Sequence, residues 1–194
     1  LSDAALMDFS DVAQQRCTLE RAVVAHPQLA KLSLLTAPIR QRGQPVTGEQ
    51  MASLLRAVRM QYDFCLLDAP AGLGDGFLLA TAAADRCVVV TTADASSLRD
   101  AQRTVMELDR LGRGNLHLVV GRVEKKLLRS LHTTIDDAMD AAGLPLLGVV
   151  PEDRNVPYAL NTGIPLRECS NYAARAYENI ARRIMGQRIP LMRI

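Results

Sequence analysis

The residue best placed for chemistry is Asp68, which directly follows the short apolar run Asp63–Leu67. The length and flanks of this run predict an inner strand of a parallel sheet. An acid at the carboxyl end of such a strand lies at the rim where open α/β sheets bind ligands, and it can position a magnesium ion. The alternative is an Asp that caps a turn before Pro70. Gly72 favours the metal site, because glycine lets the backbone come close to a ligand.

Polar residues follow three later apolar runs in the same way. They are Thr91 and Thr92, Gly121 and Arg122, and the triplet Pro151, Glu152 and Asp153. Parallel strands deliver their carboxyl ends to one edge of a sheet, so a parallel sheet would bring these residues together with Asp68. The alternative for the triplet is a plain turn that opens a helix.

The elements that must position these residues alternate between strands and helices. Apolar runs predict strands at 32–36, 63–67, 87–92, 116–120 and 146–150, all parallel members of one sheet. Helices are expected at 18–26, from Thr47 onward, and at 77–84, 97–111, 135–142 and 171–185. Continuous apolar strands are typical of a sheet covered on both faces. We therefore expect an α/β fold with a doubly wound, mainly parallel sheet and helices on both faces.

Several predicted helices have a recognisable start. Thr47–Gln50 fits the capping box S/T-x-x-E/Q. The helix that follows has a core-facing stripe with helical spacing, formed by Met51, Leu54, Leu55 and Val58. Later helices have hydroxyl residues where a cap is expected, namely Ser96 or Ser97, Thr133 or Thr134, and Ser170.

The composition is that of an ordinary globular chain. Of 194 residues, 48% are hydrophobic and 23% are charged, and the net charge is only +2, so no nucleic-acid partner is expected. The four cysteines are scattered, which argues against a zinc site, and Cys65 and Cys87 lie in apolar runs where burial is expected. No apolar stretch reaches the roughly 18 residues typical of a membrane-spanning helix.

Four motifs, in order along the chain, resemble those of the MinD family, deviant Walker ATPases that place the bacterial division site. DAPAG at 68–72 is similar to the family's DSPAG, and TTADASSLRD at 91–100 is similar to its TTPEVSSVRD. GVVPED at 148–153 looks like its GVVPED, and ALNTGIPL at 159–166 looks like its AxNxGxPL. The resemblance implies a sheet of the P-loop NTPase kind, of the SIMIBI type.

The resemblance also implies roles for the residues at the strand ends. Asp68 would hold magnesium, through water, and Ala71 and Gly72 would form the switch that senses the γ-phosphate. Asp68 and Gly72 are therefore the expected catalytic residues. Arg122 and Pro151–Asp153 would border the adenine.

The helix at 97–111 is charged on its outer side, with Arg99, Asp100 and Arg103. A solvated helix face is the simplest interpretation. In MinD-like proteins, however, partner proteins dock on this helix, and Asp100 matches a partner-contacting position. The resemblance implies these partners: a second copy of the chain when ATP is bound, the division-inhibitor and activator proteins of the Min system, and an anionic membrane surface.

The function implied by the resemblance is an ATPase that uses ATP and Mg²⁺ and regulates septum placement. It would be cytoplasmic and would associate peripherally with the inner face of the cell membrane. Three alternatives stay open: a DNA-binding partition ATPase of the ParA type, the ATP-binding domain of a cobyrinate-type amide synthase, and a scaffold that does not hydrolyse ATP. Salt-dependent DNA retention would indicate the first, and absence of ATP binding would indicate the last.

This sequence departs from the family pattern in two respects. Gly121 stands where the family usually has Asn, which removes a side-chain donor and acceptor on the adenine side. No GxxxxGK[ST] motif occurs in these 194 residues. We expect the phosphate loop to precede Leu1, within the roughly 40 residues that a strand–loop–helix–strand unit needs. Without that loop, the 194 residues alone are expected to be inactive.

The end of the chain is basic. Residues 175–194 hold five arginines and one acid, with Ile, Leu and Met interspersed. Gly186 and Pro190 interrupt any long amphipathic helix, so we expect only weak, salt-sensitive binding to anionic membranes. Residues 1–186 are expected to form the ATPase domain without its N-terminal strand and phosphate loop, and residues 187–194 a basic tail.

Overall fold

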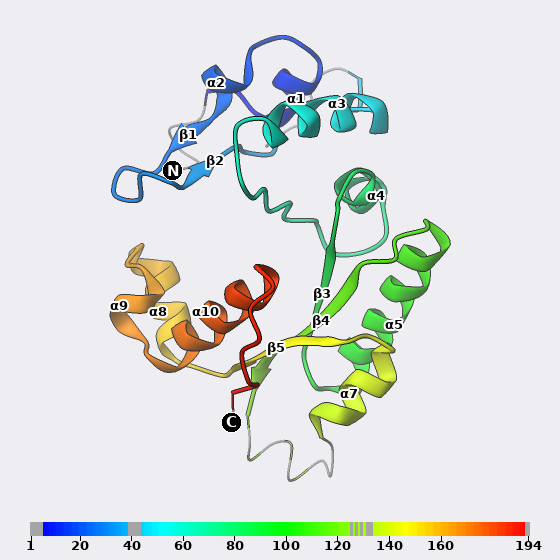
Figure 1. Cartoon of the computed structure of the whole chain (residues 1–194), viewed down its shortest axis with the longest axis vertical. Helices are drawn as coiled ribbons and strands as arrows, with labels where there is room; N and C mark the ends of the chain where they lie inside the picture. The colour runs from blue at the N-terminus through cyan, green and yellow to red at the C-terminus, as the bar shows by residue number, and fades with distance from the viewer. Residues whose placement is uncertain are drawn as a thin grey trace. The chain divides into compact units, whose positions relative to one another are not determined.

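A computed structural model describes residues 6–38, 44–124, 126, 128, 130 and 134–192 (Figure 1). The chain divides into two compact units, Leu1–Ala84 and Asp85–Ile194. Among the described residues, no helix is both long and apolar enough to cross a membrane.

Unit 1 combines helices with a short pair of strands. Its two short strands, β1 (Val24–Ala25) and β2 (Ser33–Leu34), pair antiparallel. The helices are α1 (Phe9–Ala13), α2 (Leu19–Ala22), α3 (Gly48–Arg59) and α4 (Asp75–Thr81).

Helix α3 follows the sequence prediction closely. The Thr47 hydroxyl accepts from the Gln50 N–H at 3.2 Å, and the Gln50 side chain accepts from the Thr47 N–H at 2.9 Å, so the capping box is confirmed. The predicted apolar stripe is buried, with Leu19 and Ala13 in the same core cluster. The core of unit 1 is therefore built on the face of α3 that its spacing indicates.

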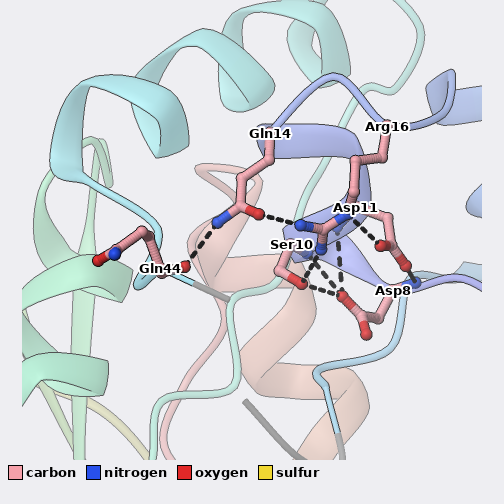
Figure 2. Close-up of polar contacts among 6 residues, drawn as sticks. All are labelled: Asp8, Ser10, Asp11, Gln14, Arg16 and Gln44. Carbon is pink, nitrogen blue, oxygen red and sulfur yellow. Dashed lines mark hydrogen bonds and ion pairs between the residues drawn. The ribbon is translucent and has the colours of Figure 1, made fainter. Parts of the chain in front are cut away.

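Helix α1 was not predicted, and a polar cluster fixes its start (Figure 2). The Asp8 carboxylate accepts from the Ser10 N–H at 2.8 Å, and the Asp11 carboxylate accepts from the Asp8 N–H at 3.1 Å. Arg16 donates through Nε to Asp11 at 2.8 Å. The Gln14 side chain donates to the Gln44 carbonyl at 2.8 Å and so ties α1 to the segment before α3.

Three predictions for unit 1 are wrong. The helix expected at 18–26 ends at Ala22, because Val24 and Ala25 pair with β2. The strand expected at 32–36 shrinks to Ser33–Leu34 and is antiparallel. The strand expected at 63–67 does not form, since no described strand pairs with it. Cys65 is consequently exposed rather than buried.

Unit 2 contains the parallel sheet. Its strands are β3 (Cys87–Thr91), β4 (Leu116–Val123) and β5 (Leu146–Pro151), paired in the order β3-β4-β5. Both pairings are parallel, as expected from the three apolar runs. The helices are α5 (Ala95–Arg110), α7 (Ile135–Ala142), α8 (Asn155–Thr162), α9 (Leu166–Cys169) and α10 (Tyr172–Ile184).

Helices cover both faces of this sheet: Figure 1 shows α5 and α7 on one side and α10 on the other. Val119 packs in a cluster with Ala176 of α10, and the fully buried Leu118 and Val120 point to the opposite face because side chains alternate along a strand. Val90 of β3, the partner of Val119 and therefore on the same face, is 69% exposed. The predicted α/β fold with a parallel sheet between helices is confirmed.

Two helix starts in unit 2 illustrate capping. Thr134 caps α7, as predicted, with its hydroxyl accepting from the Asp137 N–H at 3.1 Å. The cap of α5 is Asp94, which accepts from the Ser97 N–H at 3.0 Å, so the prediction of Ser96 or Ser97 as the cap is wrong. An ionised carboxylate is favoured at a helix N-terminus by the helix dipole as well as by hydrogen bonding.

Helix α10 lies close along β5. A side chain at Gly148 would collide with Ile180, so the glycine permits this close approach. Arg183 donates to the carbonyl of Leu147 in β5 at 2.7 Å, and to the carbonyls of Ile189 and Pro190 at 3.0 and 2.7 Å. Met192 packs against the α10 cluster. The described part of the tail therefore folds back toward β5.

Candidate nucleotide-binding site

The carboxyl ends of β4 and β5 hold the candidate site residues of unit 2. The pairing of the two strands is irregular between Val120 and Val123, where Gly121 and Arg122 interrupt the ladder. Arg122 adopts a left-handed conformation with φ 52°, which is unusual for a residue with a side chain. At this irregularity the Arg122 side chain, which is 78% exposed, reaches Glu152 at the end of β5.

Glu152 holds this guanidinium. Its Oε2 accepts from Arg122 Nε at 2.9 Å, and its N–H donates to the Val123 carbonyl at 3.1 Å. The hydrogen bond to Glu152 raises the pKa of Arg122. The structure thus brings together Arg122, Glu152 and Asp153, as the parallel arrangement predicts.

Asp153 has a different setting from Glu152. It accepts from the Asn155 N–H at 2.9 Å, from the Ala173 N–H at 3.4 Å, and from the Ser170 hydroxyl. The Ser170 hydrogen bond, followed by that of Asn155, holds the pKa of Asp153 below its ordinary value. Asp153 therefore connects the starts of α8 and α10 as an ionised group.

Asp68 and Gly72 belong to unit 1. Asp68 is exposed, and no hydrogen bond or ion pair joins it to another residue within the described ranges. Gly72 has φ 88°, a conformation that favours glycine, and a side chain at Gly76 would collide with Pro70. The exposed carboxylate of Asp68 is therefore followed by a bend in which Gly72 and Gly76 are needed for backbone conformation and close packing.

Comparison with known proteins gives relatives over nearly the whole chain, although no protein-family model matches it. The septum site-determining protein MinD of Synechocystis is 33% identical over 185 residues, which cover 94% of this chain and 70% of that protein. The MinD protein of Bacillus subtilis is 33% identical over 198 residues, covering 98% of this chain and 73% of that protein.

The chain belongs to the MinD family. Solved structures agree: the MinC:MinD cell division protein complex of Aquifex aeolicus matches with a TM-score of 0.89 and 29% identity, over 100% of this chain and 78% of that chain. MinD of Pyrococcus horikoshii, solved with Mg-ADP, matches in fold with a TM-score of 0.78 and 24% identity, over 94% of this chain and 74% of that chain. The resemblance inferred from four motifs is confirmed.

The predicted partner surface of this MinD-family chain lies on α5. Arg99, Asp100 and Arg103 are all exposed, and Arg103 approaches Asp100 at 3.9 Å, a distance that gives a weak surface ion pair. The opposite face of the helix is anchored, with Ala101 and Leu108 buried. The three charged side chains are therefore free of any role in the core.

The fit of these residues to ATP and Mg²⁺ is partial. No group of three or more His, Cys, Asp or Glu residues in the described part of the chain could hold a metal alone. Magnesium in nucleotide sites usually takes one or two carboxylates, with water and phosphate oxygens completing its shell, so a single exposed Asp68 fits. The 194 residues offer no phosphate-loop motif.

The sequence did not predict the hydrogen bonds of Asp94 and Ser170, which lie at the starts of α5 and α10. Asp94 accepts from Thr92 and Ser97, and these hydrogen bonds lower the pKa of Asp94 markedly. An Asp three residues before Ser97 was a usable capping signal. Ser170 was assigned only to a helix start, and nothing local in the sequence indicates its contact with Asp153.

Proposed function

We propose that this chain carries the nucleotide-binding part of a MinD-type ATPase that alternates between a monomer and an ATP-bound homodimer and regulates septum placement. Family membership over nearly the full chain supports the proposal. The observation that carries it is the exposed Asp68 carboxylate, which has no partner within the described ranges and precedes the left-handed Gly72. A carboxylate that only held the fold together would be expected to have a hydrogen-bonding partner.

In this proposal each residue has a separate task. Asp68 would hold Mg²⁺ through water, and Ala71 and Gly72 would form the switch that senses the γ-phosphate. Arg122 and Pro151–Asp153 would border the base. MgATP would supply the γ-phosphoryl group, which is transferred to water as ADP leaves, and these residues would position the nucleotide.

The test is Asp68→Ala in the full-length gene product. We expect loss of magnesium-dependent ATP hydrolysis with an unchanged fold, because the carboxylate compensates metal charge and is not used for packing. Asp63→Ala is the matched control, since Asp63 is an exposed acid of the same segment. Phosphate release measures ATP hydrolysis in each variant, and circular dichroism checks that its fold is unchanged. Unchanged turnover in Asp68→Ala would show that another acid serves the metal.

We also propose two binding surfaces on this protein, one for partner proteins and one for the membrane. Arg99, Asp100 and Arg103 form the proposed docking surface for division-inhibitor and activator proteins; the Aquifex homologue was solved with MinC. The basic end of the chain gives peripheral association with the cytoplasmic face of the membrane, at about 1 kcal/mol per arginine near anionic lipid.

One vesicle sedimentation assay checks both interactions. Without nucleotide, we expect the 194-residue chain to bind anionic vesicles weakly and to be released at physiological salt, because Gly186 and Pro190 interrupt the apolar face. For the full-length protein with ATP, we expect Asp100→Ala to lose co-sedimentation of the division inhibitor while vesicle binding persists. Tight binding of the 194-residue chain at physiological salt would contradict this interpretation of the tail.

A further inference from the structure

The hydrogen bonds of Asp153 occupy both of its carboxylate oxygens. Oδ1 accepts from the Asn155 N–H at 2.9 Å, and Oδ2 accepts from the Ser170 hydroxyl and from the Ala173 N–H at 3.4 Å. This carboxylate is therefore directed into the protein. Through these hydrogen bonds, Asp153 connects the loop that contains Glu152 to the starts of α8 and α10.

Ser170 is the buried member of this connection, with 6% of its surface exposed. Its hydroxyl donates to Asp153, and its oxygen accepts from the Ala173 N–H at 3.1 Å. The Ser170 hydroxyl is thus both a hydrogen-bond donor and a hydrogen-bond acceptor. Its removal would leave a carboxylate oxygen short of a donor in a partly buried position, which is a costly change.

The exposed side of the same loop carries the ion pair. Glu152 is tied to the end of β4 through its N–H and through Arg122. The Arg122 side chain is otherwise largely exposed, and Glu152 is the residue that orients it. Any displacement of Asp153 is passed to its neighbour Glu152 through one peptide bond, and from Glu152 to the guanidinium.

We propose that Ser170 is a positioning residue for the nucleotide-base side of the site, acting through Asp153 on Glu152 and Arg122. The inference rests on the function proposed above. Because Ser170 acts on the base and not on the phosphates, it controls nucleotide affinity and discrimination between adenine and guanine. The hydrolysis step itself does not depend on it.

The test compares Ser170→Ala with wild type in the full-length protein, using MgATP and MgGTP as the probes. We expect KM for ATP to rise by at least about tenfold, the size expected from one hydrogen bond to a charged group, with kcat changed less than about twofold. The preference for ATP over GTP should fall. Ser170→Thr keeps the hydroxyl and should restore both values.

Two further variants separate positioning from folding. Thr134→Ala removes from α7 a capping hydroxyl whose hydrogen bonds among the described residues go to Asp137, and should leave KM and base preference unchanged. Ser170→Cys preserves volume but donates weakly, so it should shift KM in the same direction as Ser170→Ala with less risk to folding.

The outcomes are distinct. Wild-type KM and base preference in folded Ser170→Ala or Ser170→Cys would overturn this inference alone. Equal changes in Thr134→Ala and Ser170→Ala would overturn it too, because Ser170 would then be an ordinary cap. A wild-type protein that binds no nucleotide would overturn the proposed function and this inference with it.

Discussion

Two segments of this chain have similar sequence patterns but different structures. Residues 63–72 and residues 146–153 each consist of an apolar run followed by an acidic motif. In unit 2, Leu146–Pro151 is strand β5, paired along β4 and buried over most of its length. In unit 1, residues 63–70 have no regular structure, and Leu66 is 88% exposed.

The difference shows what an apolar run requires to become a strand. A strand satisfies its backbone N–H and C=O groups only through a neighbour, so hydrophobicity alone is insufficient. The acids differ for the same reason. Asp153 follows a paired strand and is bonded to two helices, whereas Asp68 follows an unpaired run and has no partner within the described ranges.

Hydrogen exchange should give the largest contrast. Amides of β4, such as that of Leu118, should exchange at least about a thousandfold more slowly than those of residues 63–67, because the former are in a buried ladder. Exchange followed by mass spectrometry after proteolysis measures this difference. Comparable protection of both segments would show that residues 63–67 are paired in solution.

A matched pair of substitutions should sharpen the contrast in packing. Leu118→Ala removes a side chain that is 0% exposed and should lower the free energy of unfolding by about 2–5 kcal/mol. Leu66→Ala makes the same chemical change at an exposed position and should stay within about 0.5 kcal/mol of wild type. Urea denaturation is the measurement, and a large loss in Leu66→Ala would contradict the exposed placement.

Substitution of Asp153 and of Asp68 should give a smaller difference in the free energy of unfolding. Asp153→Asn should cost about 1–2 kcal/mol at pH 7, because an amide group would face the donors of Ser170 and Ala173. Asp68→Asn should change stability by less than about 0.5 kcal/mol. Urea denaturation of both variants measures the two costs, and equal losses would remove the contrast between the motifs.

The cost of Asp153→Asn should also depend on pH. The Ser170 hydrogen bond lowers the pKa of Asp153 from its ordinary value of 3.8, so the stabilisation is complete above that value and is lost as the pH falls through the lower, folded-state pKa. The difference between wild type and Asp153→Asn should therefore narrow in acid. A difference that stays constant from pH 7 into acid would indicate a steric effect in place of a charge effect.

Local patterns predicted much of unit 2 and little of unit 1. Three strands, their parallel direction and the Thr134 cap followed from runs and spacing, because each is decided within a few residues. The helix over 18–26 was overestimated because the pairing of Val24 with Leu34 competes with helical propensity. Asp94 and not Ser97 caps α5, because the Asp94 carboxylate accepts from both the Thr92 hydroxyl and the Ser97 backbone N–H.

By itself, the sequence determined the family, the α/β class, and the identity of Asp68, Gly72, Arg122 and Pro151–Asp153 as candidate site residues. Motifs and apolar runs are local, so they can be read without coordinates. Only the tertiary structure decided that Ser170 meets Asp153, 17 positions away, that Arg122 pairs with Glu152, 30 positions away, and that residues 63–67 have no ladder. Such contacts depend on which elements pack together, and a hydrogen-bonding partner distant in sequence leaves no local signature.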